Sequence, residues 1–306
     1  MIYRPEGSII SSEQNIRLIS SVEGLTEAME KGTILEARAV MCSSTHDLIV
    51  ELPCARGIIP REEGAVGIKE GSTRDIAIIS RVSKAVCFKV KELVLGIDGT
   101  ITAFLSRREA QEECLNNYIS QLRSGDIIDC RITHLEQFGC FVDVGCGIPS
   151  LIPIDAISVS RISHPSDRFE NGQYIKAVVS SNDGKRICLS HKELLGSWTE
   201  NADKFTAGET VGGIVRSVES YGIFVELAPN LAGLAEPKEN IKPGQSVSVY
   251  IKAIVPDKMK IKLVIVDVCD ELPRSAEPVY YINSDHISRW QYSSSASQKQ
   301  IYTVFE

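Results

Sequence analysis

The sequence contains no apolar run close to the ~20 residues that a membrane-spanning helix needs. Its first ten residues, MIYRPEGSII, do not place a basic stretch before a hydrophobic one, which is the pattern of a secretory signal. We therefore expect a cytoplasmic chain with no membrane partner. Hydrophobic residues make up 43% of the chain and charged residues 24%, which is typical of a soluble globular protein rather than of a disordered one.

Closely spaced metal ligands are also missing. The nine cysteines include no CxxC pair, and the five histidines form no HxH or HxxxH pair. Structural zinc needs four nitrogen or sulfur ligands, usually offered as closely spaced pairs. Most of the cysteines lie in apolar, strand-like runs, where a thiol acts as a small hydrophobic side chain. We therefore expect reduced thiols in the core, no metal site and no cofactor.

Positive charge is not concentrated anywhere. The formal net charge is −7, the acidic excess is spread thinly along the chain, and no segment is a polybasic tail. Many nucleic-acid binders carry a basic face, so this balance sets a limit on how such a ligand could be held. Neutralisation of a phosphate backbone cannot dominate the affinity, and any RNA binding must depend on base stacking with a few local cations.

An internal repeat is the strongest feature that the sequence does contain. The run GDIIDCRITHLEQFGCFVDVGCGIPSLIP begins at Gly125 and GETVGGIVRSVESYGIFVELAPNLAGLAEP begins at Gly208. Both have an alternating strand, an aromatic-Gly turn and a Phe-Val-acid-aliphatic strand. A weaker copy, GTILEARAVMCSSTHDLIVELPCARGIIP, begins at Gly32. Each interval between the copies accommodates five short strands and a linker, which favours small all-β barrels of the OB type.

The repeat divides the chain into five parts. We expect an all-β fold of tandem five-stranded OB barrels joined by short linkers, with linker-like stretches at 116–125 and 198–208. The boundaries that we predict are a polar N-terminal arm (1–23), a degenerate barrel (24–120), two well-formed barrels (121–198 and 199–270) and a C-terminal tail of unknown structure (271–306).

Several of these motifs resemble the S1 RNA-binding domain family. The resemblance is carried in the second copy by QFGCFVDVG, HPSDRF, NGQYIKAVV and KRICLSHKEL, and SRISHPSDRF is similar to bacterial ribosomal proteins S1. It covers roughly residues 24–266 and is strong in the second copy, good in the third and weak in the first. It implies OB barrels that bind single-stranded RNA, messenger RNA in particular, and attachment to the small ribosomal subunit through the first domain.

Strand alternation predicts an outward pair of aromatic residues on each of the two later barrels. In Phe141-Val142-Asp143-Val144 the valines form the apolar set, so Phe141 shares the outer face with Asp143. The third copy repeats this arrangement with Phe224 and Glu226. The aromatic residues beside the turn glycines, Phe138 and Tyr221, can reach the same faces. Rings on this face of an OB barrel can stack on bases, at about 1–3 kcal/mol per base.

Cations near the last turn of each barrel complete the predicted RNA site. Lys185 and Arg186 precede the closing strand of the second copy, and Lys260 follows the turn in the third. The family resemblance assigns RNA contacts to an Asp and an Arg on this turn, hence to Asp183 and Arg186. It extends in the same way to Asp257 and Lys260. A solvated hairpin tip is the alternative for each lysine.

The departures from the family pattern predict that the three barrels differ in RNA affinity. A histidine of many S1 domains is replaced by Pro153 in the second copy and by Glu236 in the third, so we expect the third barrel to bind RNA more weakly. In the first copy, His46 and Ile49 occupy the aromatic slots. We therefore interpret the first barrel as a docking or spacer domain.

The sequence also lacks the common catalytic motifs. The sequence has no GxSxG, no P-loop and no GxGxxG followed by a helix. Outside three barrels, too little chain remains to form a nuclease domain with clustered metal-binding acids. We therefore expect no catalytic residue and no small-molecule substrate. Two alternatives to ribosomal RNA binding stay open: an RNA-binding regulator that acts off the ribosome, and a scaffold whose barrels bind proteins.

Overall fold

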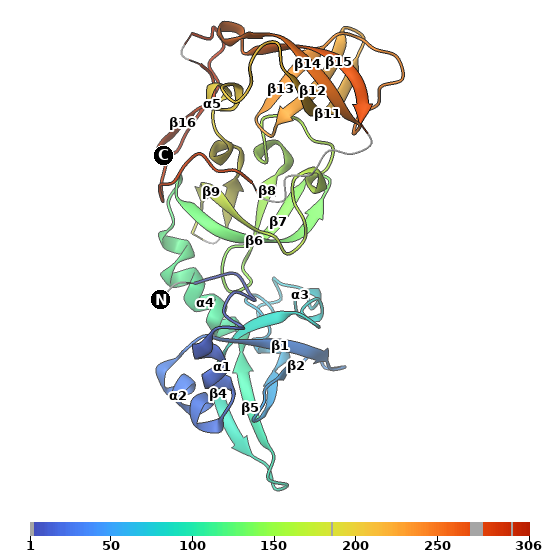
Figure 1. The fold of residues 1–306 in the computed structure, drawn as a ribbon. Helices are drawn as coiled ribbons and strands as arrows, with labels where there is room; N and C mark the ends of the chain where they lie inside the picture. Colours follow the sequence, from blue (N-terminus) through green and yellow to red (C-terminus); the bar gives the residue numbers. More distant parts are fainter. Residues whose placement is uncertain (1–2, 185, 270–277, 295) are drawn as a thin grey trace.

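Three closed barrels are stacked along one axis, from the first at one end of the molecule to the third at the other (Figure 1). The computed structural model describes residues 3–184, 186–269, 278–294 and 296–306. Each barrel has five strands in the spatial order 1-2-3-5-4, and the third strand runs parallel to the fifth. This order confirms the predicted tandem OB fold.

The first barrel contains β1 to β5, and helices surround it. Its strands are β1 (Leu35–Cys42), β2 (Leu48–Glu51), β3 (Arg56–Ile59), β4 (Ala85–Leu95) and β5 (Ile101–Ser106). The helical segments before, within and after it are α1 (Glu13–Ile19), α2 (Val22–Lys31), η1 (Arg61–Glu63), α3 (Ile76–Ile79), α4 (Arg107–Asn117) and η2 (Ile119–Gln121). Ser21 caps α2 at its start, and Gly32 ends it in the left-handed conformation (φ 61°), which glycine adopts at little cost.

The second barrel contains β6 to β10. Its strands are β6 (Ile127–Glu136), β7 (Gly139–Asp143), β8 (Pro149–Pro153), β9 (Tyr174–Asn182) and β10 (Ile187–Ser190). Short 3-10 turns punctuate it at η3 (Ile154–Ala156), η4 (Pro165–Asp167) and η5 (Lys192–Leu195). Alternate residues of β6 and β7 fill the core, as in the fully buried Cys130, Ile132, Cys140 and Val142.

The third barrel follows α5 (Trp198–Ala202), and three of its strands are ten residues long. They are β11 (Thr210–Glu219), β12 (Gly222–Ala228), β13 (Leu231–Ala235), β14 (Ser246–Val255) and β15 (Lys260–Cys269), with η6 (Pro256–Lys258) before the last. The expected linker at 198–208 therefore begins with a helix. Trp198 of that helix is only 3% exposed and packs in the core that the third barrel shares with the C-terminal tail.

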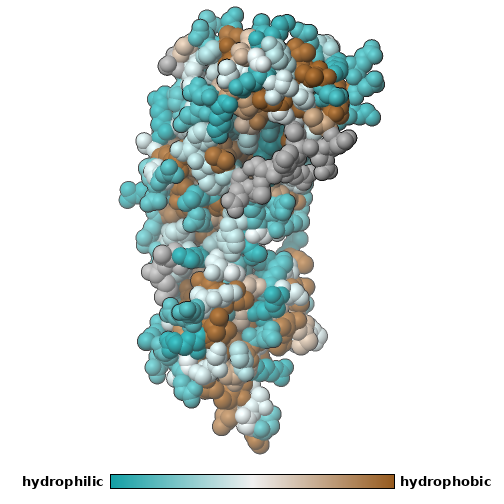
Figure 2. Space-filling view, in the orientation of Figure 1, coloured by the Kyte–Doolittle hydropathy of each residue, from teal (hydrophilic) through white to brown (hydrophobic). Residues whose placement is uncertain are grey.

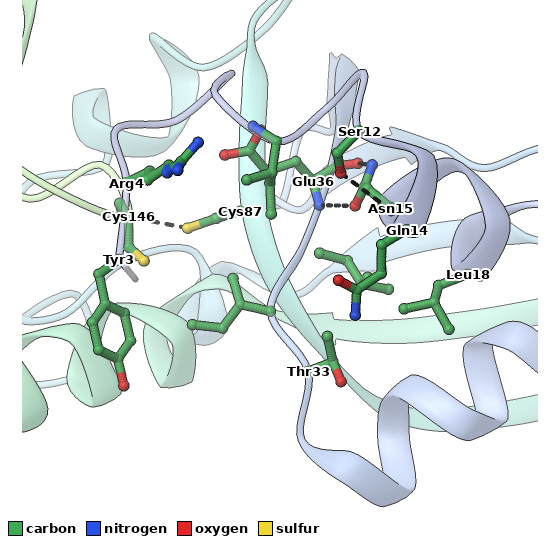
Figure 3. Close-up of a pocket in the computed structure, with 13 residues that line it drawn as sticks. Tyr3, Arg4, Ser12, Gln14, Asn15, Leu18, Thr33, Glu36, Cys87 and Cys146 are labelled. Carbon is green, nitrogen blue, oxygen red and sulfur yellow. Dashed lines mark hydrogen bonds between the residues drawn. The ribbon is translucent and has the colours of Figure 1, made fainter. Parts of the chain in front are cut away.

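The segment expected to be a polar arm is folded onto the junction of the first two barrels. We call residues 3–12 the strap. The carboxylate of Glu6 pairs with the Arg107 guanidinium inside this junction, and the backbone N–H of Glu6 donates to Asp143 (2.7 Å). After the strap, the Asn15 side chain exchanges two hydrogen bonds of 2.8 Å with the main chain of Glu36 (Figure 3). Sequence alone could not anticipate this burial because the partners of Glu6 lie about a hundred residues away.

The C-terminal tail contacts both the second and the third barrel. Its described residues contain β16 (Arg289–Gln291) and β17 (Tyr302–Val304), which pair with each other. At the second barrel, the backbone N–H of Ile127 in β6 donates to the carbonyl of Asp285 (2.9 Å). Tyr292 accepts a backbone hydrogen bond from Trp198 and donates its hydroxyl to the carbonyl of Asn230 (2.8 Å). The barrels also meet directly, because Arg168 of the HPSDRF segment pairs with Glu226 of β12 (2.5 Å).

Candidate nucleic-acid interface

The two predicted aromatic pairs are formed on the surfaces of the second and third barrels. The rings of Phe138 and Phe141 meet edge to face, with centroids 6.0 Å apart and an interplanar angle of 89°. Tyr221 and Phe224 repeat this arrangement at 6.2 Å and 87°. Phe138 is 56% exposed and Tyr221 is 65% exposed, so each pair offers a ring to solvent. Large exposed rings with fixed geometry are suited to stacking on bases.

A glycine follows the first ring of each pair because two strands approach closely there. A Cβ atom at Gly139 would lie 2.4 Å from the carbonyl oxygen of Ile152, and one at Gly222 would lie 2.7 Å from that of Ala235. Either contact would push β7 from β8, or β12 from β13. The aromatic-Gly motif therefore combines a ring for the surface with a residue that lets the strand carrying the second ring pair tightly.

Strand register extends each pair into a row across the barrel. Phe141 lies opposite His134 of β6 and Leu151 of β8, and Leu151 lies opposite Cys188 of β10. None of these side chains is buried. Phe138 and the row His134, Phe141, Leu151 and Cys188 form what we call the second-barrel platform. His134 was not among the predicted residues, and its signal was its place on the strand that pairs with the aromatic-Gly motif.

The third barrel has an equivalent row with a cation at its end. Phe224 lies opposite Ser217 and Leu234, and Leu234 lies opposite Lys262 of β15. Tyr221 and the row Ser217, Phe224, Leu234 and Lys262 form the third-barrel platform. Lys262 was not among the predicted residues. Its signal was the alternation of KIKL, in which Lys260 and Lys262 point to the same outer face.

The turn between β9 and β10 orders the predicted Asp183 and Arg186. The Arg186 N–H donates to the Asp183 carboxylate (2.6 Å), and the Asp183 N–H donates to the Arg186 carbonyl (3.1 Å). Arg186 is exposed and lies two residues before Cys188, so both side chains point to the same side of the strand. Arg186 therefore stands beside the second-barrel platform. Lys185, which was also predicted, lies outside the described residues.

The corresponding turn of the third barrel contains Asp257 within η6 and is followed directly by β15. Lys260 begins that strand opposite Val255, and both Asp257 and Lys260 are exposed. Glu236, expected to repel phosphate, lies 3.2 Å from the ammonium of Lys252. The carboxylate of Glu236 therefore already has a cation beside it.

The outer-face positions predicted for Asp143 and Glu226 do not expose these carboxylates to solvent. Asp143 is 4% exposed, and besides the N–H of Glu6 it accepts hydrogen bonds from those of Gly145 (2.8 Å) and Gly147 (3.0 Å). Burial raises the pKa of Asp143 to about 7. Glu226 is 6% exposed, held between Arg168 and Arg216. Alternation directs both carboxylates out of their barrels, but neighbouring segments cover that end of each strand.

The first barrel has no aromatic pair in the part of it that the structure describes. Ile49 lies opposite Met41 and Ile58, and Ile58 lies opposite Phe104, so the equivalent row is mainly aliphatic. His46 adopts a left-handed backbone (φ 65°) and places its ring nitrogen 3.3 Å from Asp75. This row offers no stacked pair of rings comparable with the other two platforms.

Neither a group of possible metal ligands nor a membrane-length apolar helix occurs among the described residues. Within those ranges, no group of three or more His, Cys, Asp or Glu side chains could hold a metal ion. None of the helices described is long and apolar enough to cross a bilayer. All nine cysteines are free thiols, and five of them are buried. Cys188 differs from the expectation of core thiols because it is exposed on the second-barrel platform.

Residues 121–192, which contain the second barrel, match the S1 RNA binding domain family. Over a longer stretch the chain is similar to small ribosomal subunit protein bS1 of Staphylococcus epidermidis, with 28% identity over 84% of this chain and 67% of that protein. It is also 32% identical to the bS1 homolog of Bacillus subtilis, over 53% of this chain and 46% of that protein. Among solved structures, a multidomain protein with nucleic acid binding domains from Streptococcus pneumoniae matches with a TM-score of 0.26 and 13% identity, over 79% of this chain and 76% of that one.

Proposed function

We propose that this chain is a non-catalytic protein that holds single-stranded messenger RNA at the small ribosomal subunit during translation, in the cytoplasm. The observation that carries the proposal is the repeated platform, in which an S1 barrel and its neighbour present the same edge-to-face pair of rings. The similarity to ribosomal proteins bS1 over 84% of the chain supports the ribosomal setting.

Stacking is the main source of affinity in this proposal. Acidic residues outnumber basic ones, with a net charge of −7, so phosphate neutralisation is a weak source of affinity. Every base, by contrast, has a face that can stack on a ring. Arg186 beside one platform, and Lys260 and Lys262 beside the other, supply local contacts to the backbone. Two modest sites held in one stack of barrels bind a single strand with a higher combined affinity because the second contact is intramolecular.

The first barrel is the part that we propose attaches to the ribosome. The end of its β4–β5 hairpin exposes Val94 (40%), Leu95 (71%) and Ile97 (fully). This hairpin forms the tip of the molecule, where Figure 2 shows hydrophobic surface. An exposed apolar tip on a barrel with no ring pair is suited to a protein contact rather than to RNA.

A titration of a labelled, unstructured RNA oligonucleotide tests the RNA-binding part. Replacing both rings of one platform, in Phe138→Ala/Phe141→Ala or Tyr221→Ala/Phe224→Ala, is expected to weaken binding at least fivefold, because about 1 kcal/mol or more is lost per unstacked base. Tyr302→Ala is the matched control, since Tyr302 is 53% exposed on the tail and belongs to neither platform. Equal affinity of all variants would reject the platforms as the RNA site.

Co-sedimentation with small ribosomal subunits tests the attachment. Leu95→Ser/Ile97→Ser is expected to reduce the bound fraction while RNA affinity stays unchanged. If the variant still sediments with the subunit as the unaltered protein does, the hairpin is not the attachment site.

A further inference from the structure

A groove lined by tyrosines lies on the second barrel and belongs to neither platform. Its volume is about 790 Å³, within the range of small-ligand sites. Four segments distant in sequence each contribute one ring: the strap, the end of α4, β9 and the tail provide Tyr3, Tyr118, Tyr174 and Tyr280. The N-terminus, α4 and the tail lie along one side of the molecule in Figure 1.

Contacts with neighbouring side chains and main chain hold three of these rings in place. Tyr3 and Tyr118 stack at 6.0 Å with an angle of 24° between their planes. The Tyr280 hydroxyl accepts a hydrogen bond from the backbone N–H of Lys176 (2.9 Å), and the Tyr280 ring packs on His191 at 5.7 Å. The groove is therefore formed before any ligand arrives, which lowers the entropic cost of binding.

Tyr174 is the ring that remains open to solvent. It is 51% exposed, the Arg131 guanidinium lies 5.6 Å from its centroid, and its hydroxyl lies 3.2 Å from that of Ser8. On β6, Arg131 lies opposite Tyr174 on one side and Asp143 on the other. The strap covers Asp143, so it separates this groove from the ring of Phe141.

The charges of the groove suit an anion beside the rings. Arg4 and Lys176 contribute cations at its rim, against one carboxylate, Asp129, which lies 3.4 Å from Lys176 and is 75% exposed. Stacking surfaces with a net positive rim match a planar group that carries a negative charge. An acidic peptide would use only the cations and a neutral peptide only the rings, whereas a nucleotide uses both.

We propose that the tyrosine groove binds a nucleotide, with its base on Tyr174 and its phosphate beside Arg4 and Lys176. The inference rests on the proposed function in that it adds a second kind of RNA contact to the platforms. The nucleotide can belong to an RNA strand or be free, because the groove recognises the same base and phosphate in both.

Three variants of the full chain test the proposal. Tyr174→Leu removes the ring, Tyr174→Phe keeps it but loses the contact with Ser8, and Tyr302→Leu is the control at an equally exposed tyrosine that also lies under an arginine (Arg289, 4.8 Å). We expect Tyr174→Leu to weaken binding of a 15-nucleotide RNA at least fivefold, and the other two variants to bind as the unaltered protein does. In the RNA-strand arm, a 4-thiouridine oligonucleotide should cross-link at Tyr174.

Free uridine monophosphate provides the second arm. A saturable shift of the Tyr174 ring resonances, lost in Arg4→Gln/Lys176→Gln, would indicate that a free nucleotide occupies the groove. A cross-link without such a shift would indicate that only a strand does so. Absence of both, or RNA affinity that Tyr174→Leu leaves unchanged, would overturn the proposal. The proposal would also be overturned if Tyr174→Leu reduced co-sedimentation with ribosomes but not RNA affinity, because the groove would then be a protein contact.

The result also separates this inference from the proposed function. If the platform variants bind RNA normally and Tyr174→Leu does not, the groove stands and the platforms fail. If only the platform variants lose affinity, the proposed function stands and the groove fails.

Discussion

Glu6 and Arg107, 101 positions apart in the sequence, form a buried ion pair with two contacts: Arg107 Nε lies 2.6 Å from Glu6 Oε1, and Arg107 Nη2 lies 3.1 Å from Glu6 Oε2. Their side chains are 4% and 3% exposed. Arg107 begins α4 directly after the first barrel, and Glu6 also bonds to the N–H of Cys87 in β4 and to Asp143 in β7. One strap residue thus contacts both barrels at their junction.

Glu6→Gln is expected to lower the free energy of unfolding by about 3–5 kcal/mol, because it leaves the Arg107 charge buried without its counter-charge. Urea denaturation measures the change. Glu51→Gln, at an exposed glutamate of β2, should alter stability by no more than about 0.5 kcal/mol. A small effect of Glu6→Gln would mean that water reaches Arg107 at the junction.

Glu36 makes stability depend on pH. Burial raises the pKa of its carboxyl from 4.5 to about 7, so the folded state binds the proton more tightly than the unfolded state does. Its contribution is therefore present below pH 4.5 and is lost as the pH rises through 7. Glu36→Gln mimics the protonated form. Its stability relative to the unaltered protein should rise by about 3 kcal/mol between pH 4 and pH 8. A difference that stays constant with pH would contradict this account.

His191 makes stability depend on pH in the opposite direction to Glu36. It is buried against Phe169 and Tyr280, and burial lowers its pKa from 6.5 to about 4. The neutral ring contributes stability above pH 6.5, and this is lost as the pH falls towards 4. Urea midpoints measured across this range should decline less steeply in His191→Asn than in the unaltered protein. Equal slopes would show that His191 is not the group responsible.

Lys262 is expected to contact an RNA phosphate from the third-barrel platform. Lys262→Ala should weaken RNA binding two- to fivefold and reduce the dependence of log K on log salt by about 0.7, the value for one phosphate of a single strand. Titrations at several salt concentrations measure both quantities. Lys299→Ala, at an exposed lysine of the tail, is the control. An unchanged salt slope would remove Lys262 from the site.

The residues of the platforms could be predicted in part because their signals are local. Phe138, Phe141, Tyr221 and Phe224 were selected by strand alternation and by a ring beside a turn glycine, and the structure brings each pair together. His134 and Lys262 were missed because their place depends on strand register, which a single strand does not reveal. For Asp183 and Arg186, the structure places the turn, while their contact with RNA remains a prediction.

Local patterns in the sequence were enough to predict three barrels and two pairs of outward rings. The period-two alternation, the turn glycines and the repeat act over a few residues each, and they have the same consequence wherever the barrels lie. The folded chain alone reveals that Asp143 and Glu226 are buried, that the strap and the tail join the barrels, and that four tyrosines meet in one groove. These features depend on contacts between segments far apart in the chain. Such contacts form only when whole barrels dock, and no local pattern records which surfaces will meet.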